Sequence, residues 1–510
     1  MGRRIRWLGV VLLVCFALVI VQLANIQFRQ AGALANSPYN PRIAAKVYDN
    51  QRGTIMASDG TVLAKSVKTT VSGDPYHYTR VYPQGPLYAG ITGYDSLFYG
   101  TSGIEYEYNQ YLKTHAQSPQ NFSQLLFDTP PSEPDNVTLT VDPVLQEAAT
   151  EALASTPGAN KDGAVVVLDP TTGAVLALVS NPTFDPNKIS SPDVAAEQAY
   201  DAEASAKDLE DFSGLAPIAT QERFPPGSTF KVVTSTAAYN LAPSLINYSF
   251  PPAVSIKFSD SDKTLSNDGG SACGGTMALM LPQSCDPGYG QLGIEIGVPT
   301  LTKQAEDFGY SIFGATTQYV PNLDLPNVVP STFSDLAPNS QAALAYSAIG
   351  QFNDATSPLE NALVAAGIAN GGVIMTPHLM EQIRNAQGSV VATYQPTPML
   401  TASTPAAAAA VGKLMQNVAN DTVPGATANG IFPVSWHVAV KTGTAQVQAP
   451  TGPEQTDDWM IGFMPAIGTP KLAIAVVVPY QSFSVTGAQV AGPIVKQVFQ
   501  AYLNETGGQG

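Results

Sequence analysis

The sequence predicts an α+β fold in which one antiparallel sheet packs against a layer of helices. Apolar strand patterns occur at residues 164–179 and again at 434–479, and several helical patterns lie between them. Strands that flank a run of helices and share one core are typical of this fold class. Because 44% of the 510 residues are hydrophobic, the chain can bury a large core, which excludes global disorder.

The first predicted element is an apolar run, residues 7–24, that follows a cluster of arginines. The run is near the lower limit of about 17 residues for crossing a bilayer, and the arginines predict an N-terminus that stays inside. We therefore expect a cytoplasmic tail at 1–6, an uncleaved signal-anchor at 7–24 and an extracytoplasmic remainder of a single-pass protein in the cell membrane. The competing interpretation is a signal peptide cleaved at Ala33-Leu34-Ala35, which lies far beyond the apolar run.

Residues 28–135 are predicted to form a small, irregular α+β module. A polar connector at 28–50 leaves the membrane, short apolar pieces then alternate with turn signals, and a Pro-rich linker follows at 129–135. The segment shows no repeated acidic catalytic motif, so we expect a non-catalytic interaction module. A larger domain at 136–505 and a flexible tail at 506–510 complete the chain.

The larger domain opens with a predicted strand at 137–141 and a helix that starts at Asp142-Pro143, an N-cap residue followed by proline at the first helical position. A hairpin follows at 164–168 and 174–179. The later patterns predict helices at 228–240, 340–349, 357–369, 404–419 and 489–503, and strands at 434–441, 459–464 and 471–479.

Charge and metal-ligand patterns argue against two functional classes. The formal net charge of -16 argues against a nucleic-acid partner, because phosphate binding needs clustered Lys and Arg. The histidines are scattered singly and no C-x-x-C spacing occurs, so we expect no catalytic zinc. Cys273 and Cys285 are close in sequence, which in an exported domain favours a disulfide, and two buried free thiols are the alternative.

Ser228 and Lys231 form a Ser-x-x-Lys pair that opens a predicted helix after Pro225-Pro226-Gly227. At i and i+3 the two side chains share one helix face, and the free N–H groups of the first turn favour negative charge developing at Ser228. A lysine buried there can lose its proton near neutral pH and act as a base. A helix start with a solvated lysine is the alternative, but no other Ser-x-x-Lys occurs in the sequence.

A second element, Lys441-Thr442-Gly443-Thr444, follows the apolar residues 438–440 and is predicted to be an edge strand beside a cleft. Lysine and threonine side chains can hold a substrate carboxylate, and glycine lets a substrate backbone come close. Standing alone, the same residues would more often be a strand end with a solvated lysine. A histidine-based acyl-transfer site is not expected, because the chain contains no G-x-S-x-G elbow.

The two motifs, in this order, resemble those of the penicillin-binding protein and serine β-lactamase superfamily. Arg52-Gly53-Thr54-Ile55 is similar to the start of class B penicillin-binding proteins, and residues 459–463 are similar to their strand after Lys-Thr-Gly. The similarity covers nearly the whole chain after the anchor. Within that class we favour a resemblance to the actinobacterial penicillin-binding protein A group.

The resemblance implies a penicillin-binding transpeptidase domain that cross-links peptidoglycan stem peptides through a serine acyl-enzyme and needs no cofactor. Ser228 would attack the D-Ala–D-Ala amide, and Lys231 would take its proton. Ser284 with Lys441 would return a proton to the leaving amine. The Thr442-Gly443-Thr444 run would bind the terminal carboxylate together with Lys441.

One motif departs from the family pattern. The family's Ser-x-Asn is absent, and by position Ser284-Cys285-Asp286 replaces it. An ionised Asp286 can only accept hydrogen bonds, and its pairing with Lys231 would raise the pKa of that lysine and weaken it as a base. We place Asp286 in the substrate site. The alternative is a loop that a Cys273–Cys285 bridge holds, with no catalytic part.

Three functions remain open at this point. The leading one is a membrane-anchored D,D-transpeptidase that binds β-lactams covalently, with a SEDS-type glycosyltransferase as the implied partner at the anchor and residues 28–135. The second is a catalytically impaired penicillin-binding scaffold or sensor, for which Asp286 is the best argument. The third is acyl transfer to water, by a D,D-carboxypeptidase or a β-lactamase.

Overall fold

The computed structural model describes residues 2–26, 50–69, 77–114, 133–155, 161–205, 212–448 and 454–508. The candidate cleavage site at 33–35 lies outside the described residues, as do nearly all of the connector predicted at 28–50 and most of the linker predicted at 129–135. Of the tail predicted at 506–510, residues 506–508 are described, as a turn after the last helix.

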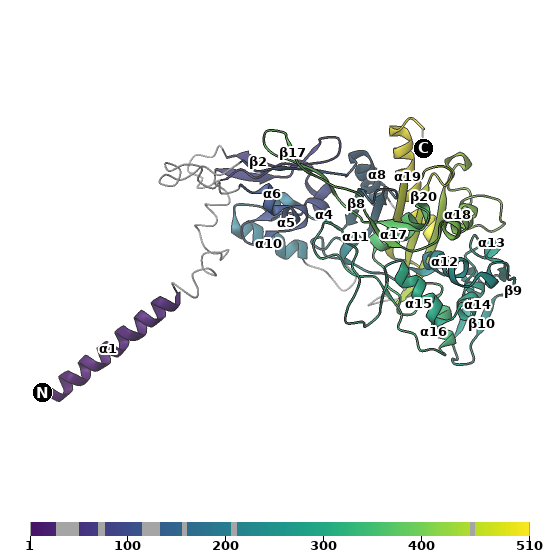
Figure 1. The fold of residues 1–510 in the computed structure, drawn as a ribbon, viewed down its shortest axis with the longest axis horizontal. Helices are drawn as coiled ribbons and strands as arrows, with labels where there is room; N and C mark the ends of the chain where they lie inside the picture. Colours follow the sequence, from purple (N-terminus) through teal and green to yellow (C-terminus); the bar gives the residue numbers. More distant parts are fainter. Residues whose placement is uncertain are drawn as a thin grey trace.

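An apolar helix, α1 (Gly2–Ala24), stands apart from the rest of the molecule at the N-terminal end (Figure 1). Its most apolar 18-residue window has a mean hydropathy of 2.7 and is 0% buried. At 1.5 Å per residue the helix is about 35 Å long, which suffices to cross a hydrocarbon core of about 30 Å. The helix coincides with the anchor predicted at 7–24 and is long and apolar enough for a single membrane span.

A six-stranded sheet joins the module predicted at 28–135 to the larger domain predicted at 136–505. Its order is β17-β16-β6-β1-β2-β3, with β1 parallel to β6 and antiparallel to β2. The strands are β1 (Ile55–Met56), β2 (Val62–Lys68), β3 (Tyr78–Val81), β6 (Asn136–Leu139), β16 (Met380–Arg384) and β17 (Val390–Thr393). The predicted module therefore pairs through β1 with β6, the first strand of the larger domain, and β6 pairs in turn with a hairpin from far along the chain.

Short elements complete this end of the molecule. They are η2 (Gly85–Tyr88), α4 (Ala89–Thr92), β4 (Asp95–Ser96), β5 (Gly100–Thr101), α5 (Gly103–Glu107), α6 (Asn109–Leu112), α9 (Pro186–Ile189) and α10 (Val194–Ser205). Glu105 of α5 is fully buried and forms ion pairs with Arg52 at 2.5 Å and with Arg80 at 2.6 Å. Two arginines offset the lost hydration of this carboxylate, so the ion cluster ties α5 to the sheet.

The larger domain is built on a five-stranded antiparallel sheet of order β19-β20-β21-β7-β8. Its strands are β7 (Gly163–Leu168), β8 (Val175–Asn181), β19 (Ala439–Gln448), β20 (Glu454–Met464) and β21 (Leu472–Ser482). Strand β7 is buried along its whole length, as expected for an inner strand that is covered on both faces. The predicted α+β fold, with the first hairpin paired to the last strands, is confirmed.

Helices cover both faces of this sheet (Figure 1). A Cβ on Gly492 of α19 (Gly487–Glu505) would lie 3.3 Å from Met460, and one on Gly412 of α18 (Pro405–Ala419) would lie 3.4 Å from Phe463. Because successive strand residues point to opposite faces, positions 460 and 463 place α19 and α18 on opposite sides of β20.

The remaining elements surround this core. The helices are α8 (Pro143–Ala154), α11 (Ile218–Gln221), η3 (Gly227–Phe230), α12 (Lys231–Leu241), η4 (Pro243–Leu245), η5 (Asp268–Gly270), α13 (Met277–Met280), α14 (Asp286–Ile296), α15 (Val298–Asp307), α16 (Gln341–Ser347), α17 (Pro358–Ala369) and η6 (Val434–Trp436). The short strands are β9 (Phe250–Ala253), β10 (Ser255–Lys257), β11 (Thr264–Ser266), β12 (Cys273–Gly275), β13 (Ser311–Ile312), β14 (Thr332–Phe333), β15 (Val373–Met375) and β18 (Pro398–Thr401).

Most predicted elements lie within a few residues of their predicted bounds. Asp142 caps α8, because its side chain accepts hydrogen bonds from the backbone of the first turn. The strand predicted at 434–441 is wrong over its first part, where Val434–Trp436 is a 3-10 turn. Strand β19 instead begins at Ala439 and continues through polar residues to Gln448, because it pairs with β20 in an unbroken register. Backbone pairing here outweighs the hydrophobic pattern.

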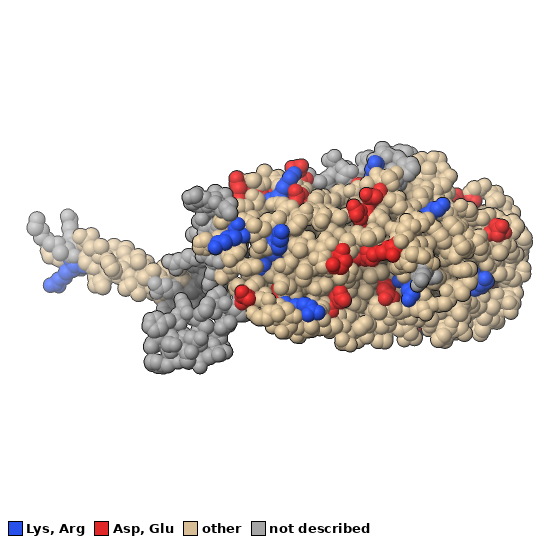
Figure 2. All heavy atoms as spheres, turned by 90° about the horizontal axis from the view of Figure 1, so that it is seen from above, with Lys and Arg blue, Asp and Glu red and all other residues tan. Residues whose placement is uncertain are grey.

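The surface carries few charges. Figure 2 shows Lys, Arg, Asp and Glu scattered singly or in small groups over a face made mostly of uncharged residues. This agrees with a sequence in which 13% of residues are charged. Because water and salt screen exposed charges, buried ones act more strongly on their neighbours.

Two glycines fix the turn that precedes η3. The N–H of Gly227 donates to the carbonyl of Gly350 at 2.9 Å, and the two residues have positive φ angles of 52° and 74°. A Cβ on Gly350 would lie 2.2 Å from the carbonyl oxygen of Gly227. Since that neighbour is backbone, no side-chain rearrangement can relieve the contact. The start of η3 therefore depends on a close approach that glycine permits.

We expect Gly350→Ala to lower the free energy of unfolding by more than about 2 kcal/mol, because the left-handed conformation alone costs about 1 kcal/mol and the contact with Gly227 adds to it. Gly388→Ala is the matched control, since Gly388 has a φ of 81° and no atom lies within 4 Å of a Cβ built there. The control should cost about 1 kcal/mol. Urea unfolding of the full chain in detergent measures both losses, and equal losses would contradict the packing argument.

Candidate active site

Ser228 lies in η3, the short 3-10 segment that leads into α12, and it lines a cavity of 300 Å³. Ser284, Asp286, Thr442 and Thr444 line the same cavity. Residues from three separate stretches of sequence thus meet between η3, the segment after α13 and strand β19. Ligands can approach this place because β19 is the edge of its sheet and has one partner strand.

Lys231 is fully buried as the first residue of α12, and its ammonium group points at the Ser284-Cys285-Asp286 segment. Its Nζ donates to the carbonyl of Ser284 at 2.7 Å, to the hydroxyl of Ser284 at 3.3 Å and to Oδ1 of Asp286 at 2.6 Å. These contacts use all three donors of the ammonium group. None of the hydrogen bonds between described residues joins Ser228 to Lys231, so the amine turns toward Ser284 instead.

Lys441 is also fully buried, and it approaches Ser284 from β19. Its Nζ donates to the Ser284 hydroxyl at 2.9 Å and to the carbonyl of Thr442 at 2.7 Å. The hydroxyl of Ser284 therefore lies between the amines of Lys441 and Lys231. A hydroxyl has one proton to donate and two lone pairs, so in this position it can pass a proton between the two amines.

Both amines have lowered pKa values. Burial lowers the pKa of Lys231, and the charge and hydrogen bond of Asp286 oppose the shift. Burial lowers the pKa of Lys441 well below its ordinary value, and the neighbouring charge of Lys231 lowers it further. The network thus favours loss of a proton, most strongly at Lys441. A neutral amine is what base-assisted acyl transfer requires.

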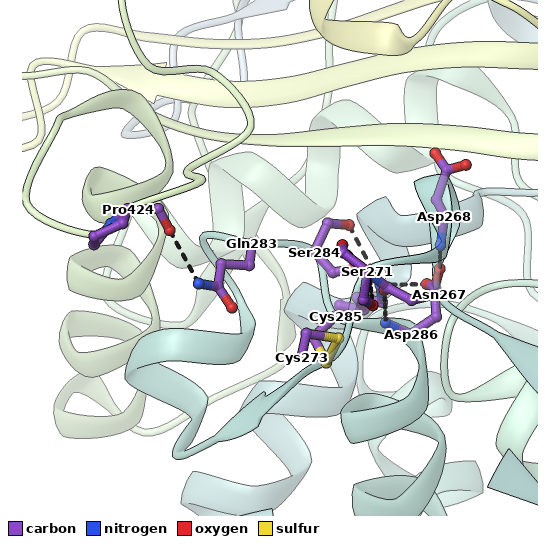
Figure 3. Close-up of a disulfide and its surroundings, with 10 residues drawn as sticks. Asn267, Asp268, Ser271, Cys273, Gln283, Ser284, Cys285, Asp286 and Pro424 are labelled. Carbon is purple, nitrogen blue, oxygen red and sulfur yellow. Dashed lines mark hydrogen bonds and ion pairs between the residues drawn. A yellow bond between two sulfur atoms is a disulfide. The ribbon is translucent and has the colours of Figure 1, made fainter. Parts of the chain in front are cut away.

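A disulfide and the side chain of Asn267 hold the Ser284-Cys285-Asp286 segment (Figure 3). Cys285 is bonded to Cys273 of β12, with a Cα–Cα distance of 5.7 Å. The N–H of Asp286 donates to the side chain of Asn267 at 3.1 Å, and Ser284 has a φ of 56°. A serine in this left-handed conformation costs about 1–3 kcal/mol. The bridge and the hydrogen bond, at the two residues that follow Ser284, keep it there.

The Lys441-Thr442-Gly443-Thr444 run lies on the edge strand β19, where the sequence predicts an edge strand. A Cβ on Gly443 would lie 2.9 Å from the Thr229 side chain, so glycine at this position lets η3 pack against the strand. Close packing of η3 on β19 sets the distance between the nucleophile and the strand.

Two threonine hydroxyls of this run have fixed partners. The Thr442 hydroxyl forms a hydrogen bond with that of Thr427 at 2.7 Å. Oγ1 of Thr444 accepts from the N–H of Gly487, the first residue of α19, at 3.1 Å. Hydroxyl groups beside the positive end of a helix suit an anion such as a carboxylate.

Several polar residues of the cavity were missed by the sequence analysis. They are Asn267, Asp268, Thr427 and Thr486. Thr486 could have been found, because Thr486 and Gln489 form a capping box, a local pattern that marks a helix start. The others come from turns whose sequence gives no sign of their distant partners.

Two family models match the chain. The one described as penicillin binding protein transpeptidase domain matches residues 163–500, and the one described as penicillin binding protein A dimerisation domain matches residues 52–132. The first match contains the five-stranded sheet and the cavity. The second falls within the predicted module at 28–135.

Similar proteins are named peptidoglycan D,D-transpeptidases. PbpA of Mycolicibacterium smegmatis is 34% identical over 99% of this chain and 100% of its own length, and PbpA of Mycobacterium tuberculosis is 33% identical over 99% of each. The solved structure of penicillin-binding protein A from M. tuberculosis as a ceftriaxone acyl-enzyme complex has a TM-score of 0.76 and 31% identity, covering 90% of this chain and 100% of that one. Its penicillin G acyl-enzyme complex has a TM-score of 0.74 and 32% identity, with 89% and 100% coverage.

We expect Cys273→Ser combined with Cys285→Ser to lower the free energy of unfolding by about 3 kcal/mol, because the cross-link closes a short loop and restricts the unfolded chain. The matched control is Cys15→Ser, since Cys15 is a free cysteine exposed on α1. Reductant should lower the thermal midpoint of the wild type and of the control, and should leave the double variant unchanged. Equal responses of all three proteins would contradict a stabilising bridge.

Proposed function

The chain belongs to the penicillin-binding protein transpeptidase family, and we propose that it is a serine D,D-transpeptidase that cross-links peptidoglycan stem peptides. The observation that carries the proposal is the pair of buried amines around the hydroxyl of Ser284, beside the cavity that Ser228 lines. A hydroxyl nucleophile next to amines of lowered pKa suits acyl transfer. The relatives named for this activity match the chain along nearly its whole length, which supports the same assignment.

In the acylation step, Oγ of Ser228 attacks the carbonyl carbon of the D-Ala–D-Ala amide, and its proton passes to the neutral amine of Lys231. The C–N bond breaks, and D-alanine leaves with a proton from Ser284. The network has gained the proton of Ser228, and it returns a proton to the hydroxyl of Ser284. The path is the contact of 3.3 Å with Lys231 or that of 2.9 Å with Lys441. Backbone N–H groups of Ser228 and Thr444 hold the oxyanion, each such donor being worth about 3 kcal/mol.

The acyl group then passes from Ser228 to an amine of a neighbouring stem peptide. A larger cleft of 680 Å³ continues from the nucleophile, and Asp268, Gln446 and Ser484 are among its lining residues. This space accommodates a second peptide, and its polar lining suits a backbone and an ammonium group. As the amine nitrogen bonds to the acyl carbon, the C–O bond to Ser228 breaks, and the proton that the amine loses passes through the network to Oγ of Ser228, which ends the cycle in its starting state.

The terminal carboxylate of the donor peptide is held by Lys441, Thr442 and Thr444. The two threonines are two residues apart on β19, so their side chains lie on one face of the strand. The free edge of β19 pairs with the extended peptide backbone. A β-lactam presents a carboxylate in the same way, and Ser228 opens its ring to form a covalent acyl-enzyme.

We also assign the orientation in the membrane, the roles of the two domains and a partner protein. The arginine cluster before the apolar part of α1 supports an orientation with the N-terminus inside and the rest of the chain outside the membrane. A disulfide suits that oxidising compartment. The module at 28–135 serves as an interaction module for the transpeptidase domain at 136–505, and with α1 it contacts a SEDS-type glycosyltransferase. The match of residues 52–132 to a dimerisation domain supports an interaction role.

We expect Ser228→Ala to abolish covalent labelling of the full chain by fluorescent penicillin, because the acyl-enzyme needs this oxygen. Ser244→Ala, which changes an exposed serine in η4, just after α12, is the control and should be labelled like the wild type. Labelling is read after denaturing electrophoresis. Loss of signal in both variants, or in neither, would contradict the assignment of the nucleophile.

We expect Asp286→Asn to move the acidic limb of the pH profile for penicillin acylation down by about one unit or more, because the charge of Asp286 raises the pKa of Lys231. Without that charge, Lys231 loses its proton at lower pH, so the variant is acylated faster than the wild type in mildly acidic buffer. Asp262→Asn, at an exposed position between β10 and β11, is the control. An unchanged or upward-shifted limb in Asp286→Asn would show that Lys231 is not the base.

A further inference from the structure

Asp458 is a fully buried carboxylic acid on β20, directly opposite Thr444 of β19. In an antiparallel pair, opposed residues place their side chains on the same face, with Cβ atoms about 5 Å apart. The carboxyl group therefore lies beside the hydroxyl of Thr444. That hydroxyl belongs to the wall of the cavity that Ser228 also lines.

Among the residues that the structure describes, the surroundings of Asp458 contain acidic and apolar groups but no counter-ion. Among the described residues, neither carboxylate oxygen has a hydrogen-bond partner of ordinary geometry. Strand β21 contributes Val478 beside it, the first turn of α19 has no titratable side chain, and η3 packs on the other face, against Trp459. The charged groups that act on it are Asp457 and Asp268. An ionised carboxylate is costly in such a place.

The hydroxyl of Thr444 has one proton to donate, and its oxygen already accepts from the N–H of Gly487 at 3.1 Å. An ionised Asp458 takes that proton, and Thr444 then turns a lone pair toward the cavity. A protonated Asp458 can donate to Thr444, whose own proton then points into the cavity. When Asp458 is protonated, Thr444 can therefore donate a hydrogen bond to an anion. When Asp458 is ionised, the lone pair of Thr444 repels an anion.

We propose that Asp458 is a positioning residue that decides whether Thr444 donates to the carboxylate of a stem peptide or β-lactam, so that this anion binds when Asp458 carries a proton. The inference rests on the proposed function, which supplies the carboxylate ligand. Asp458 acts through Thr444 and does not touch the ligand. Binding of the anion is accordingly coupled to uptake of one proton by the protein.

The titration of Asp458 falls in a range where the coupling can be measured. Burial raises the pKa of Asp458 to about 7, the Thr444 hydroxyl opposes the shift, and the charges of Asp457 and Asp268 add to it. At pH 6 about nine molecules in ten carry the proton, and at pH 8 about one in ten. Recognition of the carboxylate therefore weakens as the pH rises through this range.

The test compares the second-order rate constants of acylation by benzylpenicillin for the full chain and for Asp458→Asn, at pH 6 and at pH 8. Asparagine keeps the shape of the side chain and does not titrate. We expect the ratio of variant to wild-type rate constants to rise about tenfold from pH 6 to pH 8. Titration of Lys231 and Lys441 occurs in both proteins and largely cancels in the ratio.

The neighbouring residue provides a matched control. Burial raises the pKa of Asp457 to about 7 as well, but its side chain accepts from the N–H of Tyr480 at 3.1 Å and, as the adjacent strand residue, points to the other face. We expect the corresponding ratio for Asp457→Asn to change by less than about twofold over the same range.

A second measurement does not depend on the folding of Asp458→Asn. The methyl ester of benzylpenicillin lacks the carboxylate, so the wild-type ratio of acid to ester rate constants should fall as the pH rises from 6 to 8. In Thr444→Val that fall should be about tenfold smaller, because the route from Asp458 to the ligand is removed. The fall of the acid-to-ester ratio that remains in Thr444→Val measures the titration of Lys441.

The outcomes separate the two proposals. A ratio of Asp458→Asn to wild-type rate constants that is the same at pH 6 and pH 8, or a fall of the acid-to-ester ratio that is as large in Thr444→Val as in the wild type, would overturn the role of Asp458 while leaving the transpeptidase proposal intact. A wild type that penicillin fails to label at any pH would overturn the transpeptidase proposal, and this inference with it. A tenfold rise that also appears in Asp457→Asn would assign the effect to general burial of acid and would likewise overturn the role of Asp458.

Discussion

The candidate site depends on two buried ammonium groups that share one hydroxyl. Lys231 and Lys441 both donate to Oγ of Ser284, and Asp286 supplies a single negative charge. Like charges repel strongly in a medium of low dielectric constant, and a buried charge without a partner costs several kcal/mol. The repulsion is relieved when one of the two amines loses its proton, or when an anion enters the cavity. The first change produces a base and the second binds a carboxylate, so one constraint accounts for both requirements of the proposed acyl transfer.

The network persists because separate parts of the chain are held by contacts that tolerate little movement. Cys273 and Cys285 fix the turn that carries Ser284, and the close approach of Gly227 to Gly350 fixes the start of η3. The five-stranded sheet fixes the position of Lys441, because β19 pairs with β20 at ten positions. None of these contacts involves the reacting atoms. They nevertheless determine whether three groups from distant stretches of sequence lie within hydrogen-bond distance.

Local signals allowed the sequence to predict much of the fold and the two lysine motifs. Ser-x-x-Lys lies within four residues at a helix start, Lys-Thr-Gly-Thr lies on one strand, and the cap at Asp142 specifies another helix start. The direction of Lys231 could not be predicted, because its partner hydroxyl lies 53 residues further on, in a turn that a disulfide holds. The pairing of β1 with β6 could not be predicted from the sequence either. Strand β1 has two residues, too few for a periodic pattern, and its register is set by neighbours far along the chain.

Two carboxyl groups near the cavity show how the same side chain acquires different roles from its surroundings. Asp286 pairs with Lys231, so its charge is balanced and it favours the protonated amine. Asp458 meets Thr444 without a counter-ion, so an approaching anion favours its protonated form. On the proposal made for Asp458, substrate binding places a proton beneath Thr444, while acylation moves another through Ser284. As the pH rises, Asp458 loses the proton that favours carboxylate binding, whereas Lys231 loses the proton that prevents it from acting as a base. Recognition of the carboxylate and activation of the nucleophile therefore respond to pH in opposite directions, and the most favourable pH for the reaction lies between them.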